Sequence, residues 1–388
     1  MENKKYSILI IGLYVRTHIT AIINHLKSQN PLVDITLLTD NPNEKELLKY
    51  KDIKIAHYNV SHVKLKNRWL RHFFIDLKQR RFFKKFSKNR HYDIIDIHYP
   101  NRYMSSVIKE LRSMSERIVI SPWGSDVLRK DESELKILSK LYNEADYIAT
   151  SVNIPLGRKI IQEFKVSPQK MVGIFFGSDV IDYAIDKRGT ISQDEAKKRF
   201  SLTGRYVITC GYNQRKAQRH KEIINAIAQI KNKLPDNLTL LFPMTYGHTL
   251  NETSIEECKN DCVKYGLDAV FVTEFLSVED IYKLRMATDM FVHVQTTDAN
   301  SGSVQEYIIC NKKIVHGSWI KYEELESYKP LFYFPVDKME NLGETILKAY
   351  QSEKINLPKG VIEQVEKKAW KYTSKKMNEF YMSILQGN

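Results

Sequence analysis

Two acidic residues, Asp298 and Glu306, flank a loop of small residues that leads from an apolar run into a helical pattern. Backbone N–H groups in the first turn of a helix have no intrahelical partner, so they can bind a phosphate or the hydroxyls of a sugar. Because carboxylates accept paired hydroxyl donors well, one acid could reach a sugar while the other reaches a ribose diol. The residues that would contribute amides or side chains are Asn300, Ser301, Gly302, Ser303 and Val304.

A second loop, which follows the apolar run at residues 206–209, concentrates positive charge. Its cationic and potentially cationic residues are Arg215, Lys216, Arg219, His220 and Lys221. Arginine can bind a diphosphate through two parallel hydrogen bonds, and lysine acts as a point charge. The loop therefore suits a doubly charged diphosphate, and the alternative is a solvated basic loop without a ligand.

Polar residues also follow apolar runs in the first half of the chain. His98 comes directly after the run at residues 94–97, and Asp126 comes shortly after the run at residues 118–121. Asp126 could act as a general base or anchor a hydroxyl, and His98 is a second catalytic candidate. The structural alternatives are a helix cap for Asp126 and a hydrogen-bonded buried histidine for His98.

The turn after the first apolar run contains Gly12, and Thr17 follows it as a candidate N-cap. Glycine permits a close approach of the backbone, and a helix that starts here could face a phosphate or an acceptor. A turn without any ligand explains the same residues.

Residues 64–90 hold eleven Lys or Arg residues and a single acid, Asp76. Aromatic residues alternate with the basic ones at helical spacing, which is typical of a helix that lies in an anionic lipid interface. A solvated basic helix whose aromatic rings pack on the domain is the alternative. A nucleic-acid surface would need a supporting motif, so no nucleic-acid partner is expected. The residues predicted to face the membrane are Lys66, Arg68, Trp69, Arg71, Phe73, Phe74, Arg80, Arg81, Phe82, Phe83, Lys84 and Lys85.

Composition sets the size and the compartment. A chain of 388 residues with 43% hydrophobic residues can build two α/β domains of roughly 150–200 residues each. Its four cysteines are too few for a disulfide scaffold and lack the spacing of a metal site, so a reducing cytoplasm is expected. No apolar stretch approaches ~18 residues, and the apolar start of the chain is predicted to be a strand and not a signal peptide.

Apolar runs alternate with helical patterns along the whole chain, as in parallel βαβ units. One series of predicted strands covers residues 7–11, 35–38, 53–56, 94–97, 118–121 and 147–150. A second series covers residues 206–209, 238–242, 269–272, 290–294, 313–316 and 331–334. Two series predict an α/β fold of two doubly wound Rossmann-like domains, residues 1–183 and 184–365, that face a central cleft. Ligands bind beyond the carboxyl ends of such strands. Residues 366–388 are predicted to form a helix that crosses back to the first domain, with an end cap on the second domain as the alternative.

The order of strand, basic loop, helix and Asp298-x7-Glu306 resembles the C-terminal domain of glycosyltransferase family 4. That family is marked by two acids separated by seven residues around a Gly-containing loop. Residues 122–126 and 177–179 are similar to family positions in the first domain and at the hinge, and the end of the chain resembles the family's returning helix. The resemblance covers nearly the whole chain and implies a GT-B fold, with an acceptor-binding first domain and a donor-binding second domain.

The resemblance also implies roles for individual residues. Arg215 and Lys221 would hold the donor diphosphate, the amides of residues 300–304 would contact phosphate and sugar, and Phe275 would lie beside the base. Asp298 would hold the donor sugar and Glu306 the ribose. The family works without a metal, so neither a metal nor a cofactor is expected. Two departures stand out: the first acid is Asp where the family has Glu, and Trp123 occupies a position that is often His, which leaves His98 or Asp126 to take its place.

The implied function is the transfer of a sugar from a nucleotide-diphosphate sugar to a glycan or lipid-linked acceptor in bacterial surface polysaccharide synthesis. The enzyme would be hexosyltransferase-like, cytoplasmic and peripheral at the inner face of the membrane, and it would retain the anomeric configuration. Residues 242–247 also resemble the inverting fucosamine-lipid transferases of enterobacterial common antigen synthesis, and such an enzyme would use Asp126 as its base. A sugar-nucleotide epimerase or hydrolase and a non-catalytic membrane or glycan scaffold are the remaining alternatives.

Overall fold

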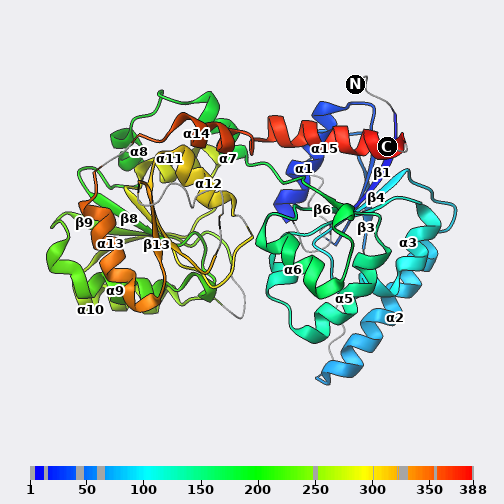
Figure 1. Ribbon diagram of the computed structural model, residues 1–388, viewed down its shortest axis with the longest axis horizontal. Helices are drawn as coiled ribbons and strands as arrows, with labels where there is room; N and C mark the ends of the chain where they lie inside the picture. Colours follow the sequence, from blue (N-terminus) through cyan, green and yellow to red (C-terminus); the bar gives the residue numbers. More distant parts are fainter. Residues whose placement is uncertain are drawn as a thin grey trace. The chain divides into compact units, whose positions relative to one another are not determined.

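The computed structural model describes residues 5–12, 16–40, 48–58, 66–247, 252–299, 301–320, 322, 331–353 and 356–386. The chain divides into two compact units (Figure 1). The first unit contains residues 1–177 together with residues 370–388, and the second contains residues 178–369.

The first unit is built on a parallel sheet whose described strands follow the order β3-β2-β1-β4-β5-β6-β7. Its central strands are almost entirely apolar and buried, as expected for a parallel sheet that helices cover on both faces. The strands are β1 (Ser7–Ile11), β2 (Asp34–Thr39), β3 (Lys54–His57), β4 (Ile94–His98), β5 (Ile118–Ser121), β6 (Tyr147–Ala149) and β7 (Met171–Val172). The helices are α1 (Arg16–Gln29), α2 (Arg68–Phe86), α3 (Ile108–Met114), α4 (Ser125–Leu128), α5 (Glu132–Glu144), α6 (Pro155–Phe164) and α15 (Trp370–Leu385).

The second unit repeats this plan with the described strand order β10-β9-β8-β11-β12-β13, again all parallel. The strands are β8 (Tyr206–Cys210), β9 (Leu238–Pro243), β10 (Asp268–Val272), β11 (Met290–His293), β12 (Lys313–Gly317) and β13 (Tyr333–Val336). The helices are α7 (Asp179–Asp186), α8 (Gln193–Arg199), α9 (His220–Ile230), α10 (Ile255–Tyr265), α11 (Val278–Ala287), α12 (Gly302–Ile309), α13 (Leu342–Gln351) and α14 (Lys359–Glu366).

In each sheet the strand order reverses once, between β1 and β4 in the first unit and between β8 and β11 in the second. Loops that leave the carboxyl ends of these neighbouring strands diverge, which is where open α/β sheets bind ligands. The predicted class of two doubly wound Rossmann-like domains is confirmed. A cleft between the two units stays a prediction.

Two boundaries differ from those expected. The first unit ends at Gly177 and not at residue 183, because α7 packs into the second unit through Val180 and Ala184, beside Tyr282 of α11. The returning helix predicted over residues 366–388 begins at Trp370 as α15, which belongs to the first unit. The preceding helix α14 ends at Glu366 and packs into the core of the second unit through residues such as Val361.

Helix α15 completes the core of the first unit although it follows the second unit in sequence (Figure 1). Its Trp370 ring stacks on His25 of α1 with 4.9 Å between ring centroids. Near its other end, the Arg117 Nε–H donates to the Ile384 carbonyl at 2.8 Å. The returning helix expected from the sequence therefore packs against α1.

Candidate functional site

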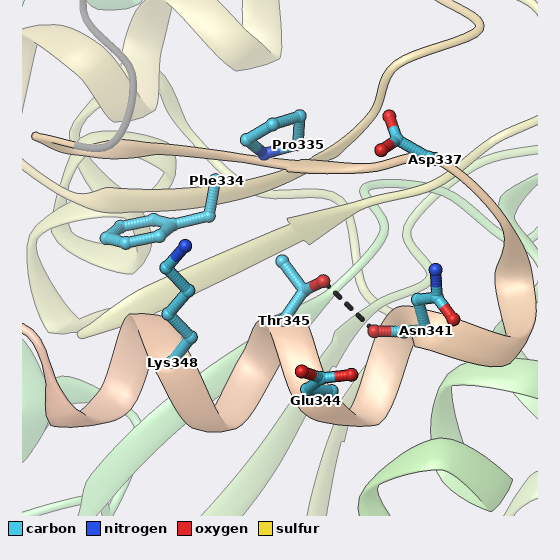
Figure 2. A pocket seen from close by; sticks show the side chains of 7 residues that line it. All are labelled: Phe334, Pro335, Asp337, Asn341, Glu344, Thr345 and Lys348. Atoms are coloured by element: carbon cyan, nitrogen blue, oxygen red, sulfur yellow. Dashed lines mark hydrogen bonds between the residues drawn. The ribbon is translucent and has the colours of Figure 1, made fainter.

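A cavity of about 290 Å³ lies between β13 and α13 of the second unit (Figure 2). Its lining residues are Phe334, Pro335, Asp337, Asn341, Glu344, Thr345 and Lys348. None of the residues singled out in the sequence lines it. Two carboxylates against one lysine make it a poor site for a diphosphate, so the chemistry has to be sought at the strand ends.

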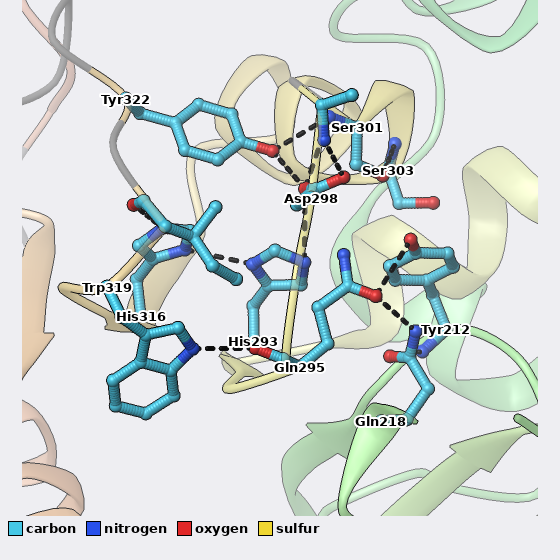
Figure 3. Close-up of polar contacts among 12 residues, drawn as sticks. Tyr212, Gln218, His293, Gln295, Asp298, Ser301, Ser303, His316, Trp319 and Tyr322 are labelled. Carbon is cyan, nitrogen blue, oxygen red and sulfur yellow. Dashed lines mark hydrogen bonds and ion pairs between the residues drawn. The ribbon is translucent and has the colours of Figure 1, made fainter. Parts of the chain in front are cut away.

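The loops that follow β8 and β11 are joined by hydrogen bonds (Figure 3). The Thr296 amide donates to the Ala217 carbonyl at 3.1 Å, which links the two backbones. The buried Gln295 Oε1 accepts from Gln218 Nε2 at 2.8 Å and from the Tyr212 hydroxyl at 3.3 Å. The predicted diphosphate loop and the predicted sugar loop thus lie together at the carboxyl ends of adjacent strands.

The first of these loops depends on Gly211, which directly follows β8. Its φ of +66° lies in the left-handed region that favours glycine. A Cβ at this position would lie 2.8 Å from Gln218 Oε1, the same atom that accepts the Tyr212 amide at 3.2 Å. Glycine therefore lets Gln218 fold back and close the loop.

The cations of this loop differ in availability. Arg215 is half-buried, and no described acidic residue forms an ion pair with its guanidinium. Lys221, by contrast, is exposed and pairs with Glu257 of α10 at 2.5 Å, a hydrogen bond that raises the pKa of Lys221 and lowers that of Glu257. Arg219 lies over the Trp319 ring at 5.0 Å from its centroid. Arg215 is thus ready to bind an anion, and Lys221 would have to leave Glu257 first.

Helix α12 begins in the second loop. Ser301 caps it, because its side chain accepts from the Ser303 amide at 3.3 Å. The Ser301 amide is itself engaged, by the Tyr322 hydroxyl at 2.7 Å and by Asp298 Oδ2 at 3.2 Å. Asn300 lies outside the described residues. The amides of Gly302 and Val304 in the same turn stay candidate phosphate donors.

Asp298 lies beneath the start of α12, and protein groups engage both of its carboxylate oxygens. Oδ1 accepts from the Ala299 amide at 2.8 Å, and Oδ2 accepts from the Tyr322 hydroxyl and the Ser301 amide. Burial raises the pKa of Asp298, whereas these hydrogen bonds act in the opposite direction. The carboxylate therefore shapes the loop, and its predicted contact with the donor sugar stays a prediction.

Glu306 is held by a buried arginine that the sequence analysis missed. Its Oε2 accepts from Nε and Nη2 of Arg285 at 3.1 and 3.0 Å, and its Oε1 accepts from the Ser178 hydroxyl at 2.9 Å. Arg285 also donates to the Tyr307 hydroxyl at 3.0 Å. The only feature of the sequence that could have revealed Arg285 is its charge on the apolar side of α11. The Ser178 contact is of the kind that Glu306 would make with a ribose hydroxyl.

Phe275 follows β10 in the same unit. Its side chain is 83% exposed, which is unusual for a phenylalanine and leaves the ring free to stack on a base. Its predicted place beside the donor base stays a prediction.

In the first unit, a cluster of buried polar side chains surrounds Asp96 of β4. Asp96 in the middle of β4 accepts from the Ser121 hydroxyl at 2.8 Å and from the Tyr381 hydroxyl, and the Nε2 atom of His98 lies 3.2 Å from its Oδ2. Asp96 was missed, although an acid inside an apolar strand pattern could have revealed it. His98 is fully buried against Trp123 and Phe176.

Asp126 is fully buried in the first turn of α4. Its Oδ1 accepts from the Trp123 amide at 2.9 Å, while its Oδ2 has no hydrogen-bond partner among the described residues. Burial raises the pKa of Asp126 to about 7. Neither Asp126 nor His98 is exposed to a substrate in this structure, so their catalytic roles stay predictions.

The structure explains the glycine at position 12 by packing, and it does not place Thr17 at the predicted N-cap. A Cβ at Gly12 would lie 2.8 Å from Ile19 Cγ1, so glycine is needed for the close packing of α1 against β1. Helix α1 begins at Arg16, and Thr17 is therefore inside the helix and not at its N-cap as expected. The loop at residues 13–15 lies outside the described residues.

Residues 7–153 match the family model described as glycosyl transferase 4-like. This segment is similar to glycosyl transferase 4-like domains. The match covers less than half of the chain, and it confirms both the resemblance found in the sequence and the predicted enzyme class, a glycosyltransferase. No curated protein matches the sequence.

Solved structures match over nearly the whole chain. A glycosyltransferase from Rickettsia africae is 15% identical with a TM-score of 0.73, covering 99% of this chain and 100% of its own. HepE from Anabaena, in complex with UDP and glucose, is 15% identical with a TM-score of 0.63 and 98% coverage of both chains. The lipopolysaccharide outer core galactosyltransferase WaaB, in its apo form, is 13% identical with a TM-score of 0.66, covering 97% and 99%. The chain has their fold, the GT-B fold.

The basic aromatic segment of this glycosyltransferase forms α2, and its aromatic residues separate into two groups. Trp69, Phe73 and Phe74 at the start of the helix are exposed, and Trp69 stacks on Phe73 with 5.9 Å between centroids. Phe83 is completely buried, and its assignment to the membrane surface is therefore wrong. Half-buried Phe82 packs edge-on against Tyr58. The exposed basic residues are Lys66, Arg71, Arg80, Arg81, Lys84 and Lys85; the side chain of Arg68 lies outside the described set.

Across the described ranges, no three His, Cys, Asp or Glu side chains are grouped so that they could hold a metal ion. The metal-free reaction stays a prediction. No described helix has both the length and the apolar character needed to span a membrane. The four cysteines are buried free thiols.

Proposed function

We propose that this enzyme transfers a sugar from a nucleotide-diphosphate sugar to a glycan or lipid-linked acceptor. The observation that carries the proposal is the joining of the Arg215 loop to the loop that starts α12. The Arg215 guanidinium, which forms no ion pair with any described acid, and the amides of a helix N-terminus then lie at the ends of adjacent strands. This is where open α/β sheets bind phosphates.

In this reaction the diphosphate leaves with a growing negative charge. Arg215 and the first amides of α12 would stabilise that charge, which is the largest contribution in many such enzymes. Glu306 would accept the ribose hydroxyls, Asp298 would contact the sugar and Phe275 would stack on the base. HepE was solved with UDP and glucose, which makes UDP the first nucleotide to test. No metal is required in this scheme, so activity should persist in a chelator.

We propose that the anomeric configuration is retained. The burial of His98 and Asp126 supports this, because an inverting enzyme needs a base that contacts the acceptor hydroxyl. The raised pKa of Asp126, about 7, is the observation that favours inversion, since it suits a general base. The anomeric configuration of the product, measured by NMR, separates the two mechanisms.

The proposed place of action is the inner face of the bacterial membrane, in surface polysaccharide synthesis. The exposed Trp69, Phe73 and Phe74 beside the exposed Arg71 support binding to an anionic lipid surface. Four free thiols support a reducing cytoplasm. The match to WaaB, an outer core galactosyltransferase, supports a glycan or lipid-linked acceptor.

Melting of the protein with UDP, GDP and TDP tests the donor site. We expect at least one nucleotide to raise the melting temperature, because a ligand that binds only the folded state stabilises it. Arg215→Ala should weaken binding about 10- to 100-fold, the value of a charge-assisted hydrogen bond. Arg199→Ala removes an exposed arginine that pairs with Asp280 and is the matched control. Stabilisation by none of the three nucleotides, or equal stabilisation of the Arg215→Ala variant, would contradict the proposal.

A further inference from the structure

The side-chain amide of Gln295, which follows β11, is held in one orientation by the loop after β8 (Figure 3). The Tyr212 amide can only donate, so Gln218 presents its Oε1 atom to it, at 3.2 Å. Gln218 Nε2 therefore faces the other way and donates to Gln295 Oε1 at 2.8 Å. The Tyr212 hydroxyl donates to the same oxygen at 3.3 Å. A backbone N–H thus decides, through two side chains, which way the Gln295 amide lies.

The nitrogen of this amide is a buried donor that no described group accepts from. Gln295 has no exposed surface, and its Nε2 atom has no hydrogen-bond partner among the described residues. Such a donor destabilises the folded state, and native structures hold few of them. The backbone is fixed as well, because the Gln295 carbonyl accepts from Trp319 Nε1 at 2.7 Å and the Thr296 amide donates to the Ala217 carbonyl. The protein therefore keeps a donor in place for a ligand.

The N–H groups of Gln295 point toward the start of α12. Figure 3 shows the nitrogen on the side of the amide that faces this helix, away from Gln218. Burial raises the pKa of the Tyr212 hydroxyl, and the nearby Ser301 side chain, the cap of α12, lowers it through a hydrogen bond. The tyrosine that contacts the Gln295 oxygen thus also contacts the cap, which places the Gln295 amide beside the helix N-terminus.

The groups around this position identify the ligand by its hydrogen-bond chemistry. The Gln295 N–H groups, the first amides of α12 and the Arg215 guanidinium all donate, and none of them accepts. Protein groups already engage both oxygens of Asp298, the acid of this loop. A sugar hydroxyl would bring a hydrogen that needs an acceptor, whereas an ionised diphosphate presents only acceptors. The positive end of the helix also favours an anion.

We propose that Gln295 is a diphosphate-binding residue whose Nε2–H donates to an oxygen of the leaving diphosphate. The proposal rests on the proposed function. Because negative charge grows on the diphosphate as it leaves, this hydrogen bond strengthens during the reaction. Gln295 is buried in this structure, so the contact requires the start of α12 to move aside when the diphosphate binds.

Titration with UDP and with uridine, followed by NMR, tests the proposal. Gln295→Met has nearly the same length and cannot donate. Gln295→Glu keeps an oxygen for Gln218 and Tyr212 and places a second oxygen where the N–H groups were. Both variants should bind UDP about 10- to 100-fold more weakly, the effect of losing a hydrogen bond to a charged group. Both should bind uridine, which has no phosphate, as the wild type does.

Gln351→Glu is the matched control, because it adds the same charge on the exposed end of α13. This end lies near the amino ends of the strands, since Lys313 at the start of β12 donates to the Ser352 carbonyl. The control should bind UDP like the wild type. Wild-type affinity for UDP in both Gln295 variants, or an equal loss for UDP and uridine, would overturn the proposal. If neither variant folds, the side-chain amide signal of Gln295 in the wild type decides: it should shift on adding UDP, and a constant signal would overturn the proposal.

Pyrophosphate separates this inference from the proposed function, because it carries neither sugar nor base. It should bind the wild type, and Gln295→Met should weaken this binding by the same factor as for UDP. Unchanged pyrophosphate binding in Gln295→Met would overturn the inference even if UDP binds. Failure of UDP, GDP and TDP to bind, with pyrophosphate binding that still depends on Gln295, would instead remove the proposed function and leave the inference standing.

Discussion

At the scale of single residues, burial and not a neighbouring charge controls the ionisation of Asp126. The side chain has no exposed surface, and only one of its oxygens accepts a described hydrogen bond. Burial therefore raises the pKa of Asp126 from 3.8 to about 7. Exposed Glu257 shows the opposite case, because its hydrogen bond to Lys221 lowers its pKa.

This shift predicts how stability depends on pH. Between about pH 4 and pH 7 the folded state binds more protons at Asp126 than the unfolded state does, so stability falls as the pH rises through this window. A pKa shift of this size corresponds to a loss of about 4 kcal/mol in the free energy of unfolding once Asp126 is ionised in the folded state. Asp126→Asn cannot ionise and keeps the acceptor for the Trp123 amide. The variant should therefore melt several degrees above the wild type at pH 8, with a much smaller gain at pH 5.

Melting curves at the two pH values measure this difference. Asp236→Asn changes an exposed acid with no such burial and serves as the control. A gain for Asp126→Asn that is the same at pH 5 and pH 8 would show that Asp126 is ionised throughout the range.

At the scale of elements, α2 shows one helix with two environments. Its second half buries Phe83 and Phe86 in the first unit, whereas Trp69, Phe73 and Phe74 in its first half are exposed. Asn67 caps the helix, since its side chain accepts from the Leu70 amide at 3.1 Å. A capped helix with an exposed aromatic end and basic flanks fits the interface of an anionic membrane.

Substitutions in the two halves of α2 should therefore act differently. Replacing Trp69, Phe73 and Phe74 together by Ser should abolish flotation with anionic vesicles at low salt and change the melting temperature little. Phe83→Ala should instead cost about 3–5 kcal/mol of stability, the usual value for a buried phenylalanine. The folded fraction of Phe83→Ala should still float with anionic vesicles, because its exposed aromatic residues are unchanged. Equal flotation of the triple variant and the wild type would end the membrane proposal.

At the scale of the whole molecule, the chain leaves the first unit at Gly177 and returns to it at Trp370. The returning helix α15 is structural, because Trp370, Met377 and Tyr381 are buried in the same core as strand β1. Tyr381 also donates to Asp96, which lies beside the predicted catalytic His98. The last residues of the chain thus help to hold the strand ends of its first half.

A chain that ends at residue 369 should lose the fold of its first unit only. Each large apolar side chain removed from a core costs about 2–5 kcal/mol, and losing several exceeds the stability of a typical domain. Hydrogen exchange should become fast in β1 and β4 and stay slow in β8 and β11. Tyr372→Ala, which changes an exposed residue of the same helix, should leave both sheets protected. Slow exchange of β1 in the shortened chain would contradict this role of α15.

Much of the fold is present in local patterns. Apolar runs predicted every described strand except the short β7, with ends that differ by at most two residues. These predictions succeed because hydrophobic period and turn residues act over short distances along the chain. The structure joins the loops after β8 and β11, which were predicted from their place at strand ends where open sheets bind ligands, and their donor-binding role stays a prediction.

Only the tertiary structure decided which side chains are buried together. Arg285 reaches Glu306 from another helix, His316 meets His293 from the neighbouring strand, and Tyr381 reaches Asp96 across most of the chain. The same limit explains the error at Phe83, whose type and spacing match those of exposed Phe73 and Phe74. Residue order determines which groups could do chemistry. Their partners, burial and protonation depend on segments far apart in sequence that meet only when the core forms.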